Sequence, residues 1–239
     1  MDTLRLPANK PLMIAHRGLS WLELENTCSA FVAAGNRTHY GIETDVHVTS
    51  DGQYIIIHDD NTKRISGDHL VVEETTFETL RSLRLLDKDG KRGRNDLRLP
   101  SLQEYIQICK RYEKKSVLEL KNFMEPQHIA NIIEIIRQEG WLENTIFISF
   151  VKENVLCVRE MLPEQKVQYL VVHYTPELLA FLKENRLDMD IFACNITAEN
   201  VQELHENGIE VNVWTVNNME EGQRMIDIGV DYITSDILE

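Results

Sequence analysis

Three acidic residues lie at the ends of apolar, strand-like runs in this 239-residue sequence. Glu43 and Asp45 are two residues apart on one run, so their side chains share one face of a strand. Neighbouring carboxylates repel each other unless a cation offsets their charge, and Glu119 offers a third oxygen ligand. Such ligands favour one divalent cation, Mg²⁺ or Ca²⁺, with Mn²⁺ as a further candidate. The alternative is a salt bridge to a neighbouring basic residue, and spacing alone favours that alternative.

Two of the eight histidines, His16 and His58, also end apolar runs. Two histidines beside a cation can act as general acid and general base near neutral pH, although a structural role fits their spacing equally well. Arg17 and Lys121 could hold a phosphate, or could pair with the acids instead. Trp214 ends a late run and could pack against a small polyol or belong to the core. Charged residues at strand ends are expected to meet at the mouth of the fold.

Apolar runs rich in β-branched residues alternate with helical patterns along the whole sequence, as expected for strands buried on both faces of a parallel sheet. The runs cover residues 12–16, 41–46, 54–58, 116–120, 145–150, 167–172, 191–195, 211–216 and 232–234. This alternation predicts an α/β fold, either a barrel or a doubly wound sheet.

Helix start signals stand between these runs. Residues 101–104, Ser-Leu-Gln-Glu, form a capping box, and Pro126 opens an amphipathic segment that ends at Gly140. Asn26 or Thr27 is expected to cap a helical run over 28–34. Glu25 is expected to bond a residue that itself contacts the ligand.

The nine runs are one more than a closed eight-stranded barrel needs. The second and third are separated only by residues 47–53, which is too short for a helix and contains Asp51-Gly52, a strong hairpin signal. We therefore expect a hairpin whose two-residue turn places Asp45 opposite His58. The alternative is a crossover without a helix between parallel strands.

Residues 60–98 lack the strand–helix alternation. Their tail, residues 87–96, is polar and contains glycine. Because loops at the mouth of a barrel commonly form the active site, we expect an excursion over that mouth. With no low-complexity linker, the sequence indicates a single domain over residues 1–239 that carries this small insertion.

The composition is acidic, with 25 Lys and Arg against 39 Asp and Glu and a formal net charge of −14. This charge argues against nucleic acid or an anionic membrane as a partner, and an anionic substrate would need a local cation. No membrane-spanning run and no secretory signal are evident, so we expect a cytoplasmic protein without stable membrane association. The four cysteines lack metal-binding spacing and are expected to be free thiols. Nothing indicates the oligomeric state.

Taken together, the motifs resemble the glycerophosphodiester phosphodiesterase family, which are barrels related to phospholipase C. The matching stretches are Ile14-Ala15-His16-Arg17-Gly18, Glu25-Asn26-Thr27, Ile42-Glu43-Thr44-Asp45-Val46, Thr49-Ser50-Asp51-Gly52, His58-Asp59, Leu118-Glu119-Leu120-Lys121, Val213-Trp214-Thr215-Val216-Asn217 and Ile233-Thr234-Ser235-Asp236. The match is ordered and nearly spans the chain, which makes it specific. Leu24, where the family often has proline, is a departure that touches no expected ligand.

The resemblance implies a TIM-type (β/α)8 barrel with a short insertion after the His58-Asp59 strand. It implies metal ligation by Glu43, Asp45 and Glu119, and catalysis by His16 and His58. It also implies substrate contacts from Arg17, Lys121 and Trp214. The implied activity is metal-dependent hydrolysis of a small glycerophosphodiester to glycerol 3-phosphate and an alcohol.

Two other classes remain open on the same barrel. A phospholipase or lysophospholipase D-type phosphodiesterase would need an apolar entrance, which the charged insertion does not suggest. A non-catalytic phosphodiester-binding barrel would be expected to lack one histidine or one ligand, and this sequence keeps them all.

Overall fold

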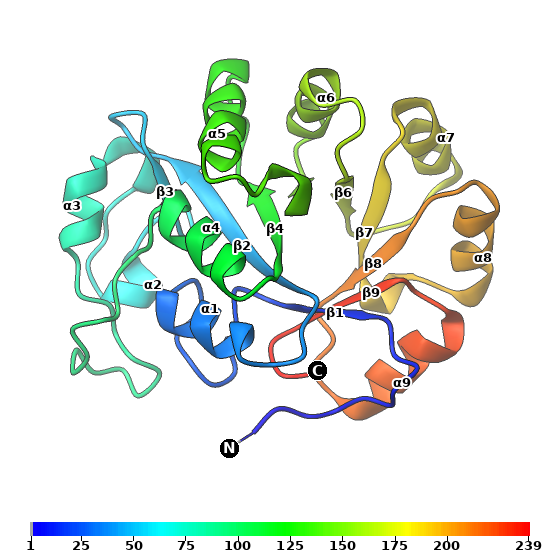
Figure 1. Ribbon diagram of the computed structural model, residues 1–239, viewed down its shortest axis with the longest axis horizontal. Coiled ribbons are helices and arrows are strands. Elements are labelled where there is room, and N and C mark those ends of the chain that lie inside the picture. The colour runs from blue at the N-terminus through cyan, green and yellow to red at the C-terminus, as the bar shows by residue number, and fades with distance from the viewer. Residues whose placement is uncertain (1) are drawn as a thin grey trace.

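Nine β-strands alternate with helices in the computed structural model, which describes residues 2–239. The strands are β1 (Leu12–Ala15), β2 (Gly41–Val48), β3 (Tyr54–Ile56), β4 (Lys115–Leu120), β5 (Thr145–Ser149), β6 (Val167–Val171), β7 (Asp188–Phe192), β8 (Val211–Trp214) and β9 (Tyr232–Ser235). All except β3 are parallel and lie in the order β1, β9, β8, β7, β6, β5, β4, β2. Pairing of β1 with β2 closes the sheet, so the predicted TIM-type barrel is confirmed (Figure 1).

The helices lie around the outside of the strands (Figure 1). They are α1 (Cys28–Gly35), α2 (Lys63–Ser66), α3 (Phe77–Ser82), α4 (Leu102–Arg111), α5 (Pro126–Gln138), α6 (Lys152–Met161), α7 (Pro176–Asn185), α8 (Ala198–Glu206) and α9 (Met219–Ile228). The predicted capping box of Ser101 and Glu104 opens α4, and Thr27 rather than Asn26 caps α1. Among the residues described, no helix is both long and apolar enough to cross a membrane.

The second and third strands form the expected antiparallel hairpin, but its register differs from the prediction. Val46 pairs with Ile56, and the amide of Ile57 donates to the carbonyl of Asp45 at 3.1 Å, so Ile57 and not His58 lies opposite Asp45. The reason is a turn of three residues rather than two, closed by Gly52 with φ of 73°. The predicted pairing of Asp45 with His58 is therefore wrong by one residue.

This hairpin brings a histidine back to the level of the acids. Strand β2 continues beyond Asp45 as far as Val48, and β3 then runs in the opposite direction. His58, two residues after β3, consequently returns to the part of β2 that carries Asp45.

Strand β7 begins three residues earlier than expected and ends at Phe192, where a single 3₁₀ turn, Ala193–Asn195, follows. The sequence Asp188-Met189-Asp190 does not look like a buried strand, because charged residues alternate with apolar ones. Met189 and Ile191 belong to the core that includes residues from the surrounding helices, whereas Asp190 on the other face lines the barrel interior.

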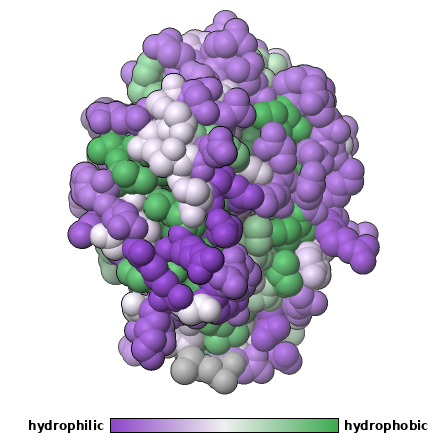
Figure 2. Space-filling model, turned by 90° about the vertical axis from the view of Figure 1, so that its left-hand side faces the viewer, coloured by the Kyte–Doolittle hydropathy of each residue, from purple (hydrophilic) through white to green (hydrophobic). Residues whose placement is uncertain are grey.

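The excursion between β3 and α4 packs around its own small apolar cluster. This cluster combines Ile55 and Ile57 of the hairpin region with Ile65, Val72, Leu80, Leu85, Leu97 and Leu99. The face of the molecule that carries the excursion is mostly hydrophilic, with scattered hydrophobic patches (Figure 2). Residues 60–98 are thus held to the barrel through the hairpin, at the side of the mouth.

Candidate active site

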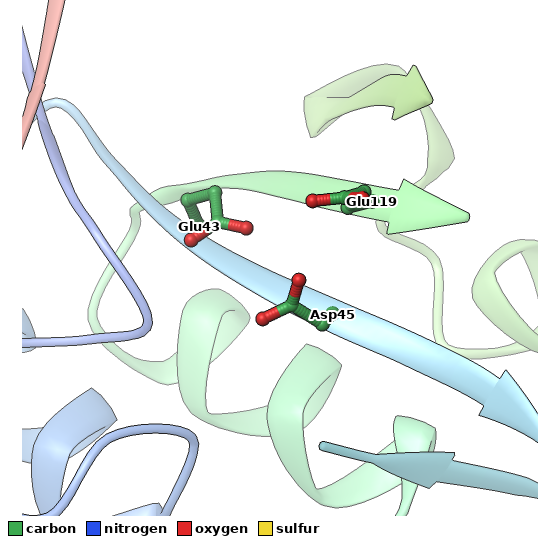
Figure 3. Close-up of side chains that lie close together, drawn as sticks. All are labelled: Glu43, Asp45 and Glu119. Carbon is green, nitrogen blue, oxygen red and sulfur yellow. The ribbon is translucent and has the colours of Figure 1, made fainter. Parts of the chain in front are cut away.

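Three acids converge on two neighbouring strands (Figure 3). Glu43 and Asp45 project from β2 and Glu119 from β4, and Asp45 and Glu119 are paired across the two strands. One oxygen of each lies within 4.8 Å of the others, and all three residues are buried. The spacing that suggested a shared face in the sequence therefore produces a compact carboxylate cluster.

Crowding and burial disturb the ionisation of this cluster. Burial, together with the charges of Asp45 and Glu119, raises the pKa of Glu43 well above its usual value. Burial and the charge of Asp45 also raise the pKa of Glu119 to about 7. Burial acts in the same direction on Asp45, but Lys121 and Arg17 outweigh it and lower its pKa to about 2. Two of the three acids thus resist ionisation unless more positive charge is present.

The donor set fits a divalent cation. Asn26 donates to one oxygen of Asp45 at 2.7 Å, while the other oxygen, Oδ1, is buried and accepts no hydrogen bond. The backbone amide of Arg17 holds one oxygen of Glu43 at 2.8 Å. Carboxylate oxygens that are oriented in this way and not fully bonded are the ligands that Mg²⁺, Ca²⁺ and Mn²⁺ prefer.

Two basic side chains also contact the acids. Lys121 Nζ lies 2.8 Å from Glu119 Oε1 and 3.5 Å from Asp45 Oδ1, and Arg17 Nε lies 3.7 Å from Asp45 Oδ2. The salt bridges that the sequence offered as the alternative to a cation are therefore formed. They do not exclude a cation, because two basic groups face three acids.

Each of the two histidines at the mouth is oriented by a carboxylate. His16 Nδ1 lies 2.7 Å from Asp236 Oδ1, and His58 Nδ1 lies 2.8 Å from Asp59 Oδ1. Both histidines line the same cavity, and Nδ1 of each is engaged, so Nε2 is the nitrogen available to a substrate. Burial lowers the pKa of His58, although Asp45 and Asp59 oppose this effect.

The roles of Asp59 and Asp236 were not predicted from the sequence. Both residues stood in the matched motifs, but neither was singled out. Their positions in the sequence could have indicated these roles, because each carboxylate follows a strand that reaches the mouth of the barrel. Asp236 is held in turn by Ser20 at 2.9 Å and Asn217 at 2.6 Å.

The cavity at the mouth has a volume of about 210 Å³ and two chemically different walls. Its lining residues are His16, Arg17, Glu43, His58, Glu119, Ile148, Phe150, Leu170, Asp190, Trp214 and Thr234. The wall from β5, β6 and β8 is mainly apolar, and Trp214 lies between Phe150 and Phe192 with ring centroids 5.5 and 5.4 Å apart. The insertion is charged as expected, and the apolar part of the lining comes from the barrel strands instead.

An arginine of the insertion joins two parts of the site. Arg64 donates to Asp59 at 2.8 and 3.0 Å and to Glu25 at 2.8 Å twice. Glu25 also accepts a hydrogen bond from Arg17 at 2.9 Å, which agrees with its expected supporting position. Arg64 was missed in the sequence, since nothing near it in the chain indicates that its partners lie 5 and 39 residues away.

Comparison with known proteins gives a consistent result. A model of the glycerophosphoryl diester phosphodiesterase family matches residues 16–239. A glycerophosphodiester phosphodiesterase of Caldanaerobacter subterraneus subsp. tengcongensis is 31% identical over 95% of this chain and 94% of its own length. A putative glycerophosphodiester phosphodiesterase of Bacillus subtilis is 28% identical, over 94% of this chain and 93% of its own.

Among solved structures, the fold is similar to that of an Oleispira antarctica phosphodiesterase in complex with the product sn-glycerol-3-phosphate. The TM-score is 0.89 at 24% identity, with 98% of this chain and 96% of that chain covered.

A closed parallel barrel whose acids, histidines and basic residues gather at one end is typical of TIM-barrel enzymes, which carry their active sites at that end. The chain belongs to the glycerophosphoryl diester phosphodiesterase family, as its motifs predicted. It is therefore an enzyme of the phosphoric diester hydrolase class.

Proposed function

We propose that this enzyme hydrolyses small glycerophosphodiesters to glycerol 3-phosphate and an alcohol, with one divalent cation and two histidines. The observation that carries the proposal is the convergence of the Glu43, Asp45 and Glu119 cluster with two histidine–aspartate pairs on one cavity. Family membership and the Caldanaerobacter relative support the substrate class.

The three acids would hold Mg²⁺ or Ca²⁺, with Mn²⁺ as a further candidate, and the cation would supply positive charge to a non-bridging phosphate oxygen. Arg17 and Lys121 contact the same acids and can turn toward a phosphate, Arg17 as a fork and Lys121 as a point charge. In this arrangement the phosphate lies against the side of the cavity that Arg17, Glu43 and Glu119 line.

The two histidines act as acid and base. One Nε2 removes the proton of the neighbouring glycerol hydroxyl as its oxygen bonds to phosphorus, and the other protonates the departing alcohol oxygen as its bond to phosphorus breaks. Water then opens the resulting cyclic phosphate, with the two histidines exchanging roles, to give glycerol 3-phosphate. Asp236 and Asp59 hold Nδ1 of His16 and His58, so that each ring keeps its orientation through the step.

The first experiment is an assay with glycerophosphocholine that follows glycerol 3-phosphate. We expect activity that EDTA abolishes and that Mg²⁺ or Ca²⁺ restores. If no divalent cation gives product from glycerophosphocholine, glycerophosphoethanolamine or glycerophosphoglycerol, the proposed reaction is wrong.

The acid–base roles are tested with His16→Ala and His58→Ala, each of which should lower kcat by at least about 10²-fold. A matched control is His205→Ala, because His205 Nε2 also lies 2.8 Å from a carboxylate, that of Asp231, but outside the cavity. Full activity in either active-site variant would exclude that histidine from catalysis.

A second candidate, a lysophospholipase D-type activity, is favoured by one observation. The apolar wall of the cavity reaches the surface at Phe150, which is exposed, and Phe123 and Val172 are exposed in loops after neighbouring strands. Comparing lysophosphatidylcholine with glycerophosphocholine separates the two candidates. If the lipid is the better substrate, Phe150→Ser should weaken its hydrolysis selectively.

A further inference from the structure

Asp190 is a buried acid of the cavity to which the catalytic proposal gives no role. It lies on β7 and only 2% of its surface is exposed. Its Oδ1 is buried without a hydrogen-bond partner although the residue lines the cavity. Buried polar groups in folded proteins are nearly always bonded, so an unbonded carboxyl group in a cavity calls for an explanation.

The neighbouring strands explain why Oδ1 of Asp190 has no partner among the described residues. On one side its paired residue is Leu170 of β6, which offers no polar group. On the other side its paired residue is Asn212 of β8, whose amide is engaged with Gln168 and Thr234, each at 3.1 Å. Burial and the charge of Glu119 raise the pKa of Asp190 well above its usual value, so the group favours the neutral acid, which can both donate and accept.

Asp190 also lies across the barrel from the acids of β2. Three strands separate β7 from β2 in either direction around the barrel: β6, β5 and β4 on one path, β8, β9 and β1 on the other. A substrate whose phosphate lies against Glu43, Asp45 and the basic residues therefore extends its far end toward β7.

A second unbonded polar atom belongs to the same wall. Trp214, next to β7 on β8, lines the cavity, and its indole Nε1 is buried without an acceptor. Two residues that line this part of the cavity, Asp190 and Trp214, thus each carry a buried polar atom without a partner, among apolar neighbours that include Leu170 and Ile148. This combination suits a single hydroxyl group of a small polyol, which accepts from the indole and exchanges a hydrogen bond with the carboxyl group.

We propose that Asp190 and the indole N–H of Trp214 bind the terminal hydroxyl of the substrate's glycerol group. Asp190 is then a specificity-determining residue that distinguishes glycerol from an alcohol without that hydroxyl. The inference rests on the proposed glycerophosphodiesterase function and deepens it.

The test compares two substrates that differ in one group. Glycerophosphocholine carries the terminal hydroxyl, whereas 2-hydroxypropyl phosphocholine lacks it and keeps the hydroxyl next to the phosphate ester. The wild-type enzyme should prefer glycerophosphocholine in kcat/KM by at least about tenfold, because losing the hydroxyl leaves buried polar groups unpaired. Asp190→Leu should bring that ratio close to one, and Asp190→Asn should retain part of it.

Binding gives a readout that does not depend on turnover. In calorimetry with Mg²⁺ present, glycerol 3-phosphate should bind the wild type more tightly than 2-hydroxypropyl phosphate, and Asp190→Leu should remove the difference. Asp188→Asn is the matched control, because Asp188 lies on the same strand but accepts from the amide of Glu210 at 2.9 Å outside the cavity. It should keep the full preference.

Thermal unfolding separates a binding role from a structural one. If Asp190 is kept for binding, Asp190→Leu should leave the Tm unchanged or raise it, since an unbonded polar group is removed from an apolar site. A lowered Tm in both Asp190→Leu and Asp190→Asn, or equal hydrolysis of the two substrates by the wild type, would overturn the inference while leaving the proposed function intact. Failure to hydrolyse either substrate would instead contradict the proposed function.

Discussion

Each histidine at the mouth of this barrel has one ring nitrogen committed to a carboxylate. The bonds from His16 to Asp236 and from His58 to Asp59 are 2.7 and 2.8 Å long; the first joins opposite ends of the sequence and the second joins adjacent residues. A carboxylate in this position fixes the tautomer and the orientation of the imidazole, and it stabilises the ring when it carries a proton. We therefore regard Asp59 and Asp236 as positioning residues.

Replacing one of these carboxylates should change both rate and pH dependence. In Asp59→Asn, we expect kcat to fall at least about tenfold, part of the roughly 10²- to 10⁴-fold contribution of a positioned acid or base. Because the Asp59 carboxylate raises the pKa of His58, its loss should lower that pKa further. The limb of the pH–rate profile that reports His58 should then move to lower pH.

The matched control for this measurement is Asp231→Asn, which alters the His205 pair outside the cavity. The Asp231→Asn variant should have the same pH–rate profile as the wild type. An Asp59→Asn enzyme with an unchanged profile and rate would show that the pair has no part in catalysis.

The insertion contributes to the site through one short helix. Arg64 of α2 bonds Asp59 and Glu25 at once, and these two acids hold His58 and Arg17 respectively. The insertion thus links two residues that follow different strands, Arg17 after β1 and His58 after β3. Its own apolar cluster against the hairpin fixes where α2 lies.

Arg64→Met should remove this link without unfolding the protein. We expect kcat/KM to fall about 10- to 100-fold, because small displacements of catalytic groups are costly, while the Tm stays close to that of the wild type. Arg92→Met is the control, since Arg92 is also half-exposed in the insertion but bonds Asp68 and the Ser66 carbonyl instead. Equal activity of the two variants would contradict a role for this link.

The sequence predicted the residues of this site better than their geometry. Strand-end positions and ordered motifs identified Glu43, Asp45 and Glu119, because β-strands place residues two apart on one face. The register of the hairpin could not be read in the same way, since it depends on the conformation of three turn residues. Asp190 was overlooked because its strand alternates acids with apolar residues, a pattern that a buried parallel strand seldom shows.

At the scale of the whole molecule, a buried histidine lies against the C-terminal segment. His39, just before β2, is 1% exposed, and its Nε2 lies 3.1 Å from the carbonyl of Leu238. Burial lowers the pKa of His39 to about 4, against 6.5 for an ordinary histidine. The folded protein therefore keeps this ring neutral in a pH range where the unfolded chain would protonate it.

Stability should fall as the pH is lowered through that range. Above about pH 6.5 neither state binds the proton, and between about 6.5 and 4 only the unfolded state does, so about 2 kcal/mol should be lost from pH 7 to pH 5. Urea unfolding at both pH values should show this loss, and His39→Gln should reduce it by that amount. His69→Gln, at an exposed histidine, should not reduce it, and an unchanged loss in His39→Gln would contradict the prediction.

The contacts of Lys121 and Arg17 with the buried acids also link two binding events. A phosphate that draws Lys121 away from Glu119 leaves the acids with uncompensated negative charge, which increases their attraction for a cation. Thermodynamic reciprocity then requires a bound cation to strengthen phosphate binding by the same factor. We expect the enzyme to hold its metal weakly at rest and firmly with substrate, so that the substrate helps to assemble the site that cleaves it.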